Sequence, residues 1–312
     1  MINWQKIQGL RKHYLSLGQA GSKDYWNDLE LIESYDKVLG ERIAWKWSAV
    51  LNQVKDRISF TTSVSVLDWG CGTAVASRKF YEYFGETIVS INLHDRSRKV
   101  ANYASKRLAA EVKDCNISIL DSMPAEKSTV ALLSHVINEF DEKDLDRLVH
   151  SLRGHELIIW LEPGTHRESR RLNHVRAELL DEYEVIAPCS HQSKCPMQQE
   201  EHSSHWCHFF ARPPAEAFQS QLWAEAKKHL GIDLRSLPTS FLCLMRKEGT
   251  GVVSTSSDSA AVLIGRPRIY KGYLKYLECS EAGLSEVRLQ KRDNKKLFKQ
   301  LSDGVFSMPQ TK

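Results

Sequence analysis

The stretch VLDWGCGTAVAS, residues 66–77, joins an apolar run to a turn and to the start of an amphipathic segment. The run ends in Asp68, and Gly70 and Gly72 follow it. Glycine is needed where a backbone turns tightly or approaches a ligand, because a Cβ atom would clash. Open α/β sheets bind ligands at the carboxyl ends of their strands, where such turns lie. The stretch therefore predicts a strand, a ligand-binding turn and a helix.

Short β-branched runs alternate with amphipathic stretches around this turn, over about residues 61–186. Strand followed by helix, several times over, indicates βαβ crossovers and a largely parallel sheet covered on both faces. Residues 24–54 carry Leu, Ile, Trp and charges at helical spacing, which predicts one long helix or a helical hairpin. Further along, residues 215–230 are predicted to be helical, residues 239–247 to return to the sheet as a strand, and the end of the chain to form short strands.

Composition is that of a soluble globular protein, with 312 residues, 42% of them hydrophobic and 26% charged. No uninterrupted apolar run of about 18 residues exists, so no membrane association is expected. The net charge of +4 is uneven, because residues 247–312 hold 12 Lys and Arg against 7 Asp and Glu. This basic end is either an ordinary solvated face or a surface for a polyanion.

The D-x-G-x-G turn resembles the first motif of class I methyltransferases, which use S-adenosylmethionine. The G-x-G-x-x-G pattern of nucleotide dehydrogenases is incomplete here. The resemblance implies a cofactor site at Asp68, Gly70 and Gly72. It also implies that Asp95, after the second strand, accepts hydrogen bonds from ribose hydroxyls, and that Asp121, after the third strand, lies at the adenine ring.

A catalytic residue is not identified from the sequence. Methyltransferases of exocyclic amines often carry D/N-P-P-Y/F after the fourth strand, where this chain reads SHVINEF, with His135, Asn138 and Glu139 but no Pro-Pro. The APCS at residues 187–190 resembles the nucleophile site of cytosine-C5 RNA methyltransferases, but it follows the wrong strand-helix unit.

A second stretch, CSHQSKCPMQQEEHSSHWCHF at residues 189–209, concentrates soft ligands. Its cysteines, Cys189, Cys195 and Cys207, are not spaced as the C-x-x-C of zinc ribbons. Three thiolates leave one position of a four-ligand site for a histidine (191, 202, 205 or 208) or a distant cysteine. All-thiolate ligation suits zinc or an iron–sulfur cluster. The remaining cysteines are Cys71, Cys115, Cys243 and Cys279.

CSHQSKCP…WCHF, LEPGT and RPR…GYLKYLEC together resemble the methyltransferase-like proteins associated with the mitochondrial small ribosomal subunit, and their bacterial relatives. The resemblance implies a [4Fe–4S] cluster on Cys189, Cys195, Cys207 and Cys279, with zinc as the alternative metal. It also implies binding to small-subunit ribosomal RNA during assembly. We further expect a monomeric free protein and a cytoplasmic location, or a mitochondrial one in a eukaryote.

We therefore expect an α/β fold built on a class I methyltransferase (Rossmann-like) sheet. An N-terminal helical region would span residues 1–60, and the cofactor domain residues 61–186 plus 210–248. A cysteine-rich metal-binding insertion would span residues 187–209, and a basic C-terminal β unit residues 249–312.

The basic β unit is the predicted RNA-binding surface. Phosphate contacts are expected from Arg266, Arg268, Lys271 and Lys275, and Tyr270, Tyr273 and Tyr276 either stack on bases or pack on the core.

The sequence leaves three functions open. The chain is a methyltransferase of small-subunit ribosomal RNA, a non-catalytic assembly factor that keeps the fold, or a metal-containing methyltransferase of a protein or small molecule. The missing Pro-Pro favours the second, and the ordered acidic residues favour the first.

Overall fold

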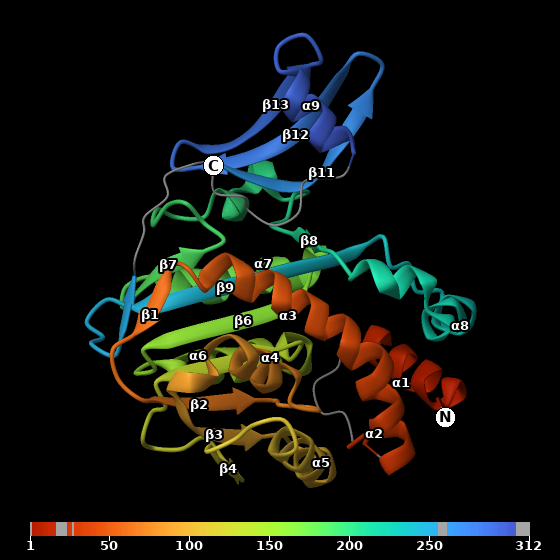
Figure 1. Cartoon of the computed structure of the whole chain (residues 1–312). Helices are drawn as coiled ribbons and strands as arrows, with labels where there is room; N and C mark the ends of the chain where they lie inside the picture. Colours follow the sequence, from red (N-terminus) through yellow and green to blue (C-terminus); the bar gives the residue numbers. More distant parts are fainter. Residues whose placement is uncertain (1, 17–23, 27, 255–260, 304–312) are drawn as a thin grey trace.

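An eight-stranded sheet forms the centre of the protein (Figure 1). The structure is a computed structural model that describes residues 2–16, 24–26, 28–254 and 261–303. The strand order is β4-β3-β2-β5-β6-β9-β7, and β8 pairs with β9 off this path. The strands are β2 Val64–Trp69, β3 Ile88–His94, β4 Asn116–Ile119, β5 Val130–Ser134, β6 Leu157–Pro163, β7 Tyr183–Ala187, β8 Phe209–Ala211 and β9 Leu237–Arg246.

Neighbouring strands from β4 to β6 pair in parallel, whereas β9 runs antiparallel to β6, β7 and β8. The near-continuous Val, Ile and Leu runs explain this arrangement, since parallel strands are buried on both faces. The predicted α/β fold with a largely parallel central sheet is confirmed, and the strand at residues 239–247 does return to the sheet as β9.

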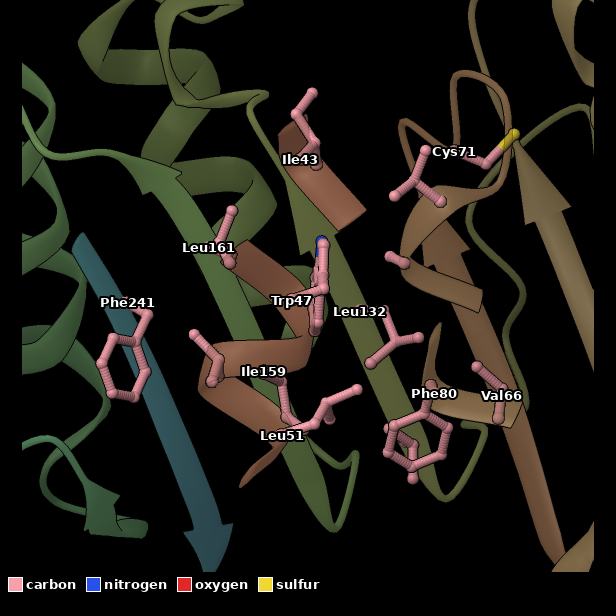
Figure 2. Packing of buried hydrophobic residues seen from close by; sticks show 14 of the residues in the cluster. Ile43, Trp47, Leu51, Val66, Cys71, Phe80, Leu132, Ile159, Leu161 and Phe241 are labelled. Atoms are coloured by element: carbon pink, nitrogen blue, oxygen red, sulfur yellow. The ribbon is translucent and has the colours of Figure 1, made fainter. Parts of the chain in front are cut away.

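Alternate side chains of the strands pack on opposite faces of the sheet. Leu132 and Ile159 face a cluster that includes residues of α3 Glu41–Val54, α4 Val75–Phe84 and α5 Arg98–Ala109. Figure 2 shows Trp47 of α3 and Phe80 of α4 within this cluster.

The opposite face carries the side chains of the intervening positions. Leu133 and Trp160 pack with residues of α6 Glu142–Leu152 and α7 His166–Leu179. The period-2 alternation of a strand accounts for the two separate cores.

The N-terminal helices lie against one end of this assembly (Figure 1). After α1 Trp4–Ser16, the helix α2 Leu29–Tyr35 continues through a π turn, Asp36–Gly40, directly into α3. Of the two alternatives predicted for residues 24–54, one long helix or a helical hairpin, the structure has a nearly continuous helical run that starts at Leu29. A smaller cluster joins α1 and α3 to α8 Gln221–Leu230.

A second, three-stranded antiparallel sheet is built from β11 Val262–Tyr270, β12 Tyr273–Ser280 and β13 Gly283–Gln290, with α9 Lys295–Ser302 packed on it. A short pair, β1 Ile58–Phe60 with β10 Val252–Ser254, lies elsewhere. Gly265 N donates to the carbonyl of His208 at 2.9 Å, which ties β11 to the segment before β8. No helix among the described residues is long and apolar enough to span a membrane.

Candidate cofactor site and four-cysteine cavity

A cavity of about 360 Å³ lies at the carboxyl ends of β2, β3 and β5. β3 and β4 lie on one side of β2, and β5 and β6 lie on the other. The ends of β2 and β5 therefore flank the switch point of the sheet, which is where open α/β sheets bind ligands. The volume is within the usual range for cofactor pockets, about 300–1,000 Å³. Figure 2 shows two lining residues, Ile43 and Cys71, at this end of the strands.

The glycine turn after β2 forms one wall of this cavity. Gly70 has φ +72°, and a Cβ at this position would lie 2.4 Å from Cγ1 of Val136. Gly72 has φ +51°, but a Cβ there would meet no atom within 4 Å. Gly70 is therefore required by both backbone conformation and packing. Gly72 is required only by its backbone conformation.

Asp68 lies behind the turn and does not line the cavity. It is fully buried, and its Oδ2 accepts hydrogen bonds from the backbone N–H and the hydroxyl of Ser77, at 3.2 and 2.6 Å. Burial raises the pKa of Asp68 to about 6. The residue therefore joins the turn to α4, and no contact with a ligand in the cavity is open to it without movement.

Asp95 lines the cavity and is held by backbone donors. Its Oδ2 accepts from Gly72 N at 3.0 Å, and its Oδ1 accepts from Ser97 N at 2.9 Å. Burial raises its pKa, and these two hydrogen bonds act against that rise. A carboxylate fixed in this way is well placed to accept hydrogen bonds from hydroxyls of a bound ligand.

Asp121 is not brought to the cavity. Its side chain is 92% exposed and forms an ion pair with Arg98 at 2.7 Å. Of the five sequence-predicted cofactor residues, Gly70, Gly72 and Asp95 line the cavity, Asp68 lies behind its wall and Asp121 lies outside it.

Two basic side chains of α3 form another part of the cavity wall and were not found from the sequence. Arg42 and Lys46 are one helical turn apart, and Lys46 is only 6% exposed. Burial lowers the pKa of Lys46 to about 7; the charge of Arg42 acts in the same direction, and Glu162 acts against it. The available signal was a lysine at a buried position of an amphipathic helix, between Ile43 and Val50.

Polar groups at the ends of β5 and β6 complete this region. His135 lines the cavity with φ +57°, and its Nε2 has no hydrogen-bond partner among the described residues. Glu162 is fully buried, and its Oε1 accepts from the backbone N–H groups of Val136 and Ile137 and from Trp160 Nε1. Burial raises the pKa of Glu162 to about 7. Left-handed backbone at a non-glycine residue is costly and concentrates at functional sites.

The four predicted metal ligands, Cys189, Cys195, Cys207 and Cys279, line a second and much smaller cavity of about 20 Å³. The first three come from the segment after β7, and Cys279 comes from β12. The thiol of Cys279 is 3.7 Å from Nε2 of His191. His191 and Cys279 are 88 positions apart in the chain, and they meet where β12 lies next to the cysteine-rich segment.

The four-cysteine cavity does not have the geometry of a single-ion site. Within the described part of the chain, no group of three or more His, Cys, Asp or Glu is arranged to hold one metal ion. The predicted metal-binding insertion is therefore not shown. Its donor set, four thiols directed at one cavity, matches the chemistry of a polynuclear centre, whose ligands stand farther apart than those of one ion. The space between the thiols holds about one water molecule, so such a centre would require them to move outward.

A buried arginine lies beside these thiols. Arg176 is 1% exposed and donates from Nη2 to the carbonyl oxygens of His191 and Ser193, at 3.1 and 2.9 Å. Burial raises the pKa of Cys189, and the charge and hydrogen bond of Arg176 lower it in part. Burial likewise raises the pKa of Cys279, to about 12, and the neighbouring thiols add to the rise. Four thiols therefore stay protonated unless a bound cation compensates their charge.

The chain matches one known protein family over most of its length. Residues 41–298 match the family described as mitochondrial small ribosomal subunit Rsm22. The chain belongs to the Rsm22 family. No curated protein sequence matches this Rsm22-family chain.

Solved structures resemble this Rsm22-family chain only weakly. Mitomycin 7-O-methyltransferase is 14% identical, with 78% of this chain and 68% of that chain covered and a TM-score of 0.42. Ribosomal protein L11 methylase of Lactobacillus delbrueckii subsp. bulgaricus is 11% identical, with coverage of 64% and 78% and a TM-score of 0.37. Precorrin-6y C5,15-methyltransferase of Geobacter metallireducens is 10% identical, with coverage of 64% and 87% and a TM-score of 0.38.

The predicted RNA-binding residues of the Rsm22-family chain lie on β11, β12 and the turn between them. Arg268 and Lys275 both form ion pairs with Glu286 of β13. Lys271 is exposed at the turn, and the guanidinium of Arg266 lies 4.3 Å over the ring of Phe210.

The tyrosines of this sheet are arranged in two ways. Tyr270 and Tyr273 stack on each other with centroids 4.8 Å apart, and Arg288 lies 4.1 Å over Tyr273. Tyr276 instead packs against the small core under α9. Tyr270 and Tyr273 could therefore still stack on a base, as predicted. Tyr276 packs on the core, which was the alternative prediction.

Proposed function

We propose that this Rsm22-family chain binds S-adenosylmethionine in the cavity at the ends of β2, β3 and β5 and methylates RNA of the small ribosomal subunit. The observation that carries the proposal is the glycine turn at the switch point, held to β3 by Asp95. Gly70 and Gly72 would let the backbone approach the ligand, and Asp95 would accept from its ribose hydroxyls. Bound there, the cofactor supplies a methyl group on a sulfonium sulfur.

The family description supports the choice of partner, because it names the mitochondrial small ribosomal subunit. The basic surface supports RNA as the component that is contacted, since residues 247–312 carry five more positive than negative charges. We propose Arg266, Arg268, Lys271 and Lys275 as phosphate contacts and the stacked Tyr270 and Tyr273 as a platform for a base. The compartment would be that of the ribosome served, cytoplasmic or mitochondrial.

We further propose that Cys189, Cys195, Cys207 and Cys279 hold a [4Fe–4S] cluster, with zinc as the alternative. The support is the convergence of four thiols on one cavity next to the buried positive charge of Arg176. Such a centre would fasten β12 of the basic sheet to the segment after β7. Structural metal sites contribute on the order of 10 kcal/mol to folding. The role of the centre would then be to order the RNA-binding sheet.

The decisive experiment has two stages. Calorimetry with S-adenosylmethionine tests the cofactor site, and transfer of labelled methyl groups to purified small subunits tests the reaction. Label in ribosomal RNA supports the proposal, and label in protein favours a protein methyltransferase. Cofactor binding with no transfer identifies an assembly factor that keeps the fold. A chain that binds no cofactor overturns the proposal.

A further inference from the structure

Lys46 is a buried lysine that lines the proposed cofactor cavity. It is 6% exposed, and among the described residues it forms neither an ion pair nor a hydrogen bond. On α3 its neighbours about one turn away are Ile43, Val50 and the basic Arg42. A lysine in such a place costs stability unless its amine is neutral or takes part in ligand chemistry. The side chain is therefore unexplained by packing.

Burial lowers the pKa of Lys46 to about 7, and the charged groups that face it act on this pKa in both directions. Arg42 lies one turn earlier on α3, and burial lowers its pKa only to about 10, so it remains a cation at neutral pH. Burial lowers the pKa of His135, at the end of β5, well below its ordinary value, and the charge of Lys46 lowers it further. The charge of Glu162, at the end of β6, raises the pKa of Lys46. Oε1 of Glu162 already accepts three hydrogen bonds from other groups. Arg11, Asp95 and Glu139 line the same cavity farther around its wall.

Several aromatic side chains line the cavity. Trp69 and His94 stack with centroids 3.7 Å apart at one side, and Tyr25, Trp26 and Phe140 also line it. Enzymes that modify a base extrude it into a pocket with aromatic walls. A nucleobase is therefore the acceptor class that best fits the lining.

We propose that Lys46 is the proton acceptor for methylation of a nucleobase nitrogen that enters this cavity. The inference rests on the proposed function and adds the acceptor class and the catalytic residue. The acceptor nitrogen forms the new N–CH₃ bond while the C–S bond of the donor breaks, and the electron pair of that bond stays on sulfur. The proton of the methylated nitrogen moves to Nζ of Lys46 and is later lost to solvent. A base whose pKa is close to the working pH is the most effective in this role.

The first test measures Lys46 in the intact protein without any reaction. Trace labelling with acetic anhydride at several pH values, followed by peptide mass spectrometry, reports the neutral fraction of each amine. Lys46 is expected to reach half-maximal labelling at about pH 7, well below the ordinary lysine value of about 10.4, and exposed Lys55 serves as the reference amine in the same digest. Labelling of Lys46 that follows Lys55, or no labelling at any pH, overturns the inference.

The second test uses Lys46→Met, Lys46→Arg and the control Lys55→Met. Both Lys46 variants are expected to lose about 100-fold in single-turnover methyl transfer to small-subunit RNA, while cofactor affinity stays within about threefold of wild type. Lys55→Met is expected to match wild type in both. Equal transfer by wild type and Lys46→Met overturns the role of Lys46 but leaves the proposed function standing. A wild-type protein that binds cofactor and transfers no methyl group overturns both.

Discussion

Oδ2 of Asp95 accepts a hydrogen bond from the backbone N–H of Gly72 at 3.0 Å, so the end of β3 holds the turn that follows β2. The two residues are 23 positions apart in the chain, yet they form adjoining parts of one cavity wall. The carboxylate and the glycine are thus parts of a single unit, in which the side chain fixes the backbone that approaches the ligand.

Replacing Gly70 with alanine is expected to cost more stability than replacing Gly72. Gly70→Ala adds a methyl group 2.4 Å from Val136 at a backbone φ of +72°, so about 2–4 kcal/mol of destabilisation is expected. Gly72→Ala meets no atom within 4 Å, and about 1 kcal/mol is expected from its left-handed backbone alone. Urea unfolding of both variants measures the difference. Equal losses would contradict the packing argument at Gly70.

Asp95 and Asp121 are expected to differ sharply in cofactor binding. Asp95→Ala removes the carboxylate that lines the cavity and holds Gly72, so a loss of at least about tenfold in affinity for S-adenosylmethionine is expected. Asp121→Ala changes a side chain that is 92% exposed, and affinity is expected to be unchanged. Isothermal titration calorimetry compares the two. A loss of affinity confined to Asp121→Ala would refute the placement of the site.

Asp68 makes stability fall as pH rises. Its pKa is about 6 in the folded chain against an ordinary value of 3.8, so the native state holds the proton more tightly. The stability that this group contributes is present below about pH 4 and is lost as pH rises through 6, on the order of 3 kcal/mol in all. Asp68→Asn keeps an acceptor for Ser77 and removes the titration. The difference in free energy of unfolding between the variant and wild type is therefore expected to grow between pH 4 and 6, and a constant difference would show that Asp68 does not titrate there.

Cys279 is expected to control the metal content, whereas Cys115 is not. Cys279 lies on β12 and lines the four-cysteine cavity, while Cys115 lies just before β4. Protein purified without oxygen is expected to contain roughly four irons and four sulfides per chain, and Cys279→Ser is expected to lose most of them. Cys115→Ser is expected to match wild type. One zinc and no sulfide in wild type would replace the cluster with a zinc site, and full iron in Cys279→Ser would remove Cys279 from the ligand set.

Glu286 is expected to weaken RNA binding. One carboxylate pairs with both Arg268 and Lys275, so part of the basic surface is neutralised. Glu286→Gln frees these two cations, and tighter binding to small-subunit RNA is expected, with a salt-dependence slope steeper by about 1. Lys271→Ala is expected to weaken binding and flatten the slope. Filter binding at several salt concentrations measures both, and unchanged affinity in both variants would place the RNA surface elsewhere.

Most of the fold could be predicted from local sequence patterns. The buried runs of β5 and β6 and the glycine turn between β2 and α4 are set by nearby residues, so a parallel sheet with a ligand-binding turn was predictable. Long-range placement was harder to predict. Lys46 joins the cavity because α3 packs against β5 and β6, where Trp47 contacts the same cluster as Leu132 and Ile159. Asp121 misses the cavity because β4 lies two strands away from β2.

For the cysteines, too, the local sequence predicted more than the long-range contacts could be predicted from it. The local stretch predicted that Cys189, Cys195 and Cys207 lie near one another, and the family resemblance pointed to Cys279. Arg176 could not be linked to them from the sequence, because a basic residue on a charged helix is ordinarily exposed.

The position of β9 sets the order in which the protein can be completed during synthesis. β9 lies between β6 and β7, so these two earlier strands cannot join until residue 246 has been made. β1 likewise pairs with β10, and must await residues 252–254. While the intervening chain is being translated, the apolar edge of β6 has no partner strand, a state that invites pairing with other chains. A protein proposed to serve the ribosome would thus need most of its own translation finished before its central sheet is closed.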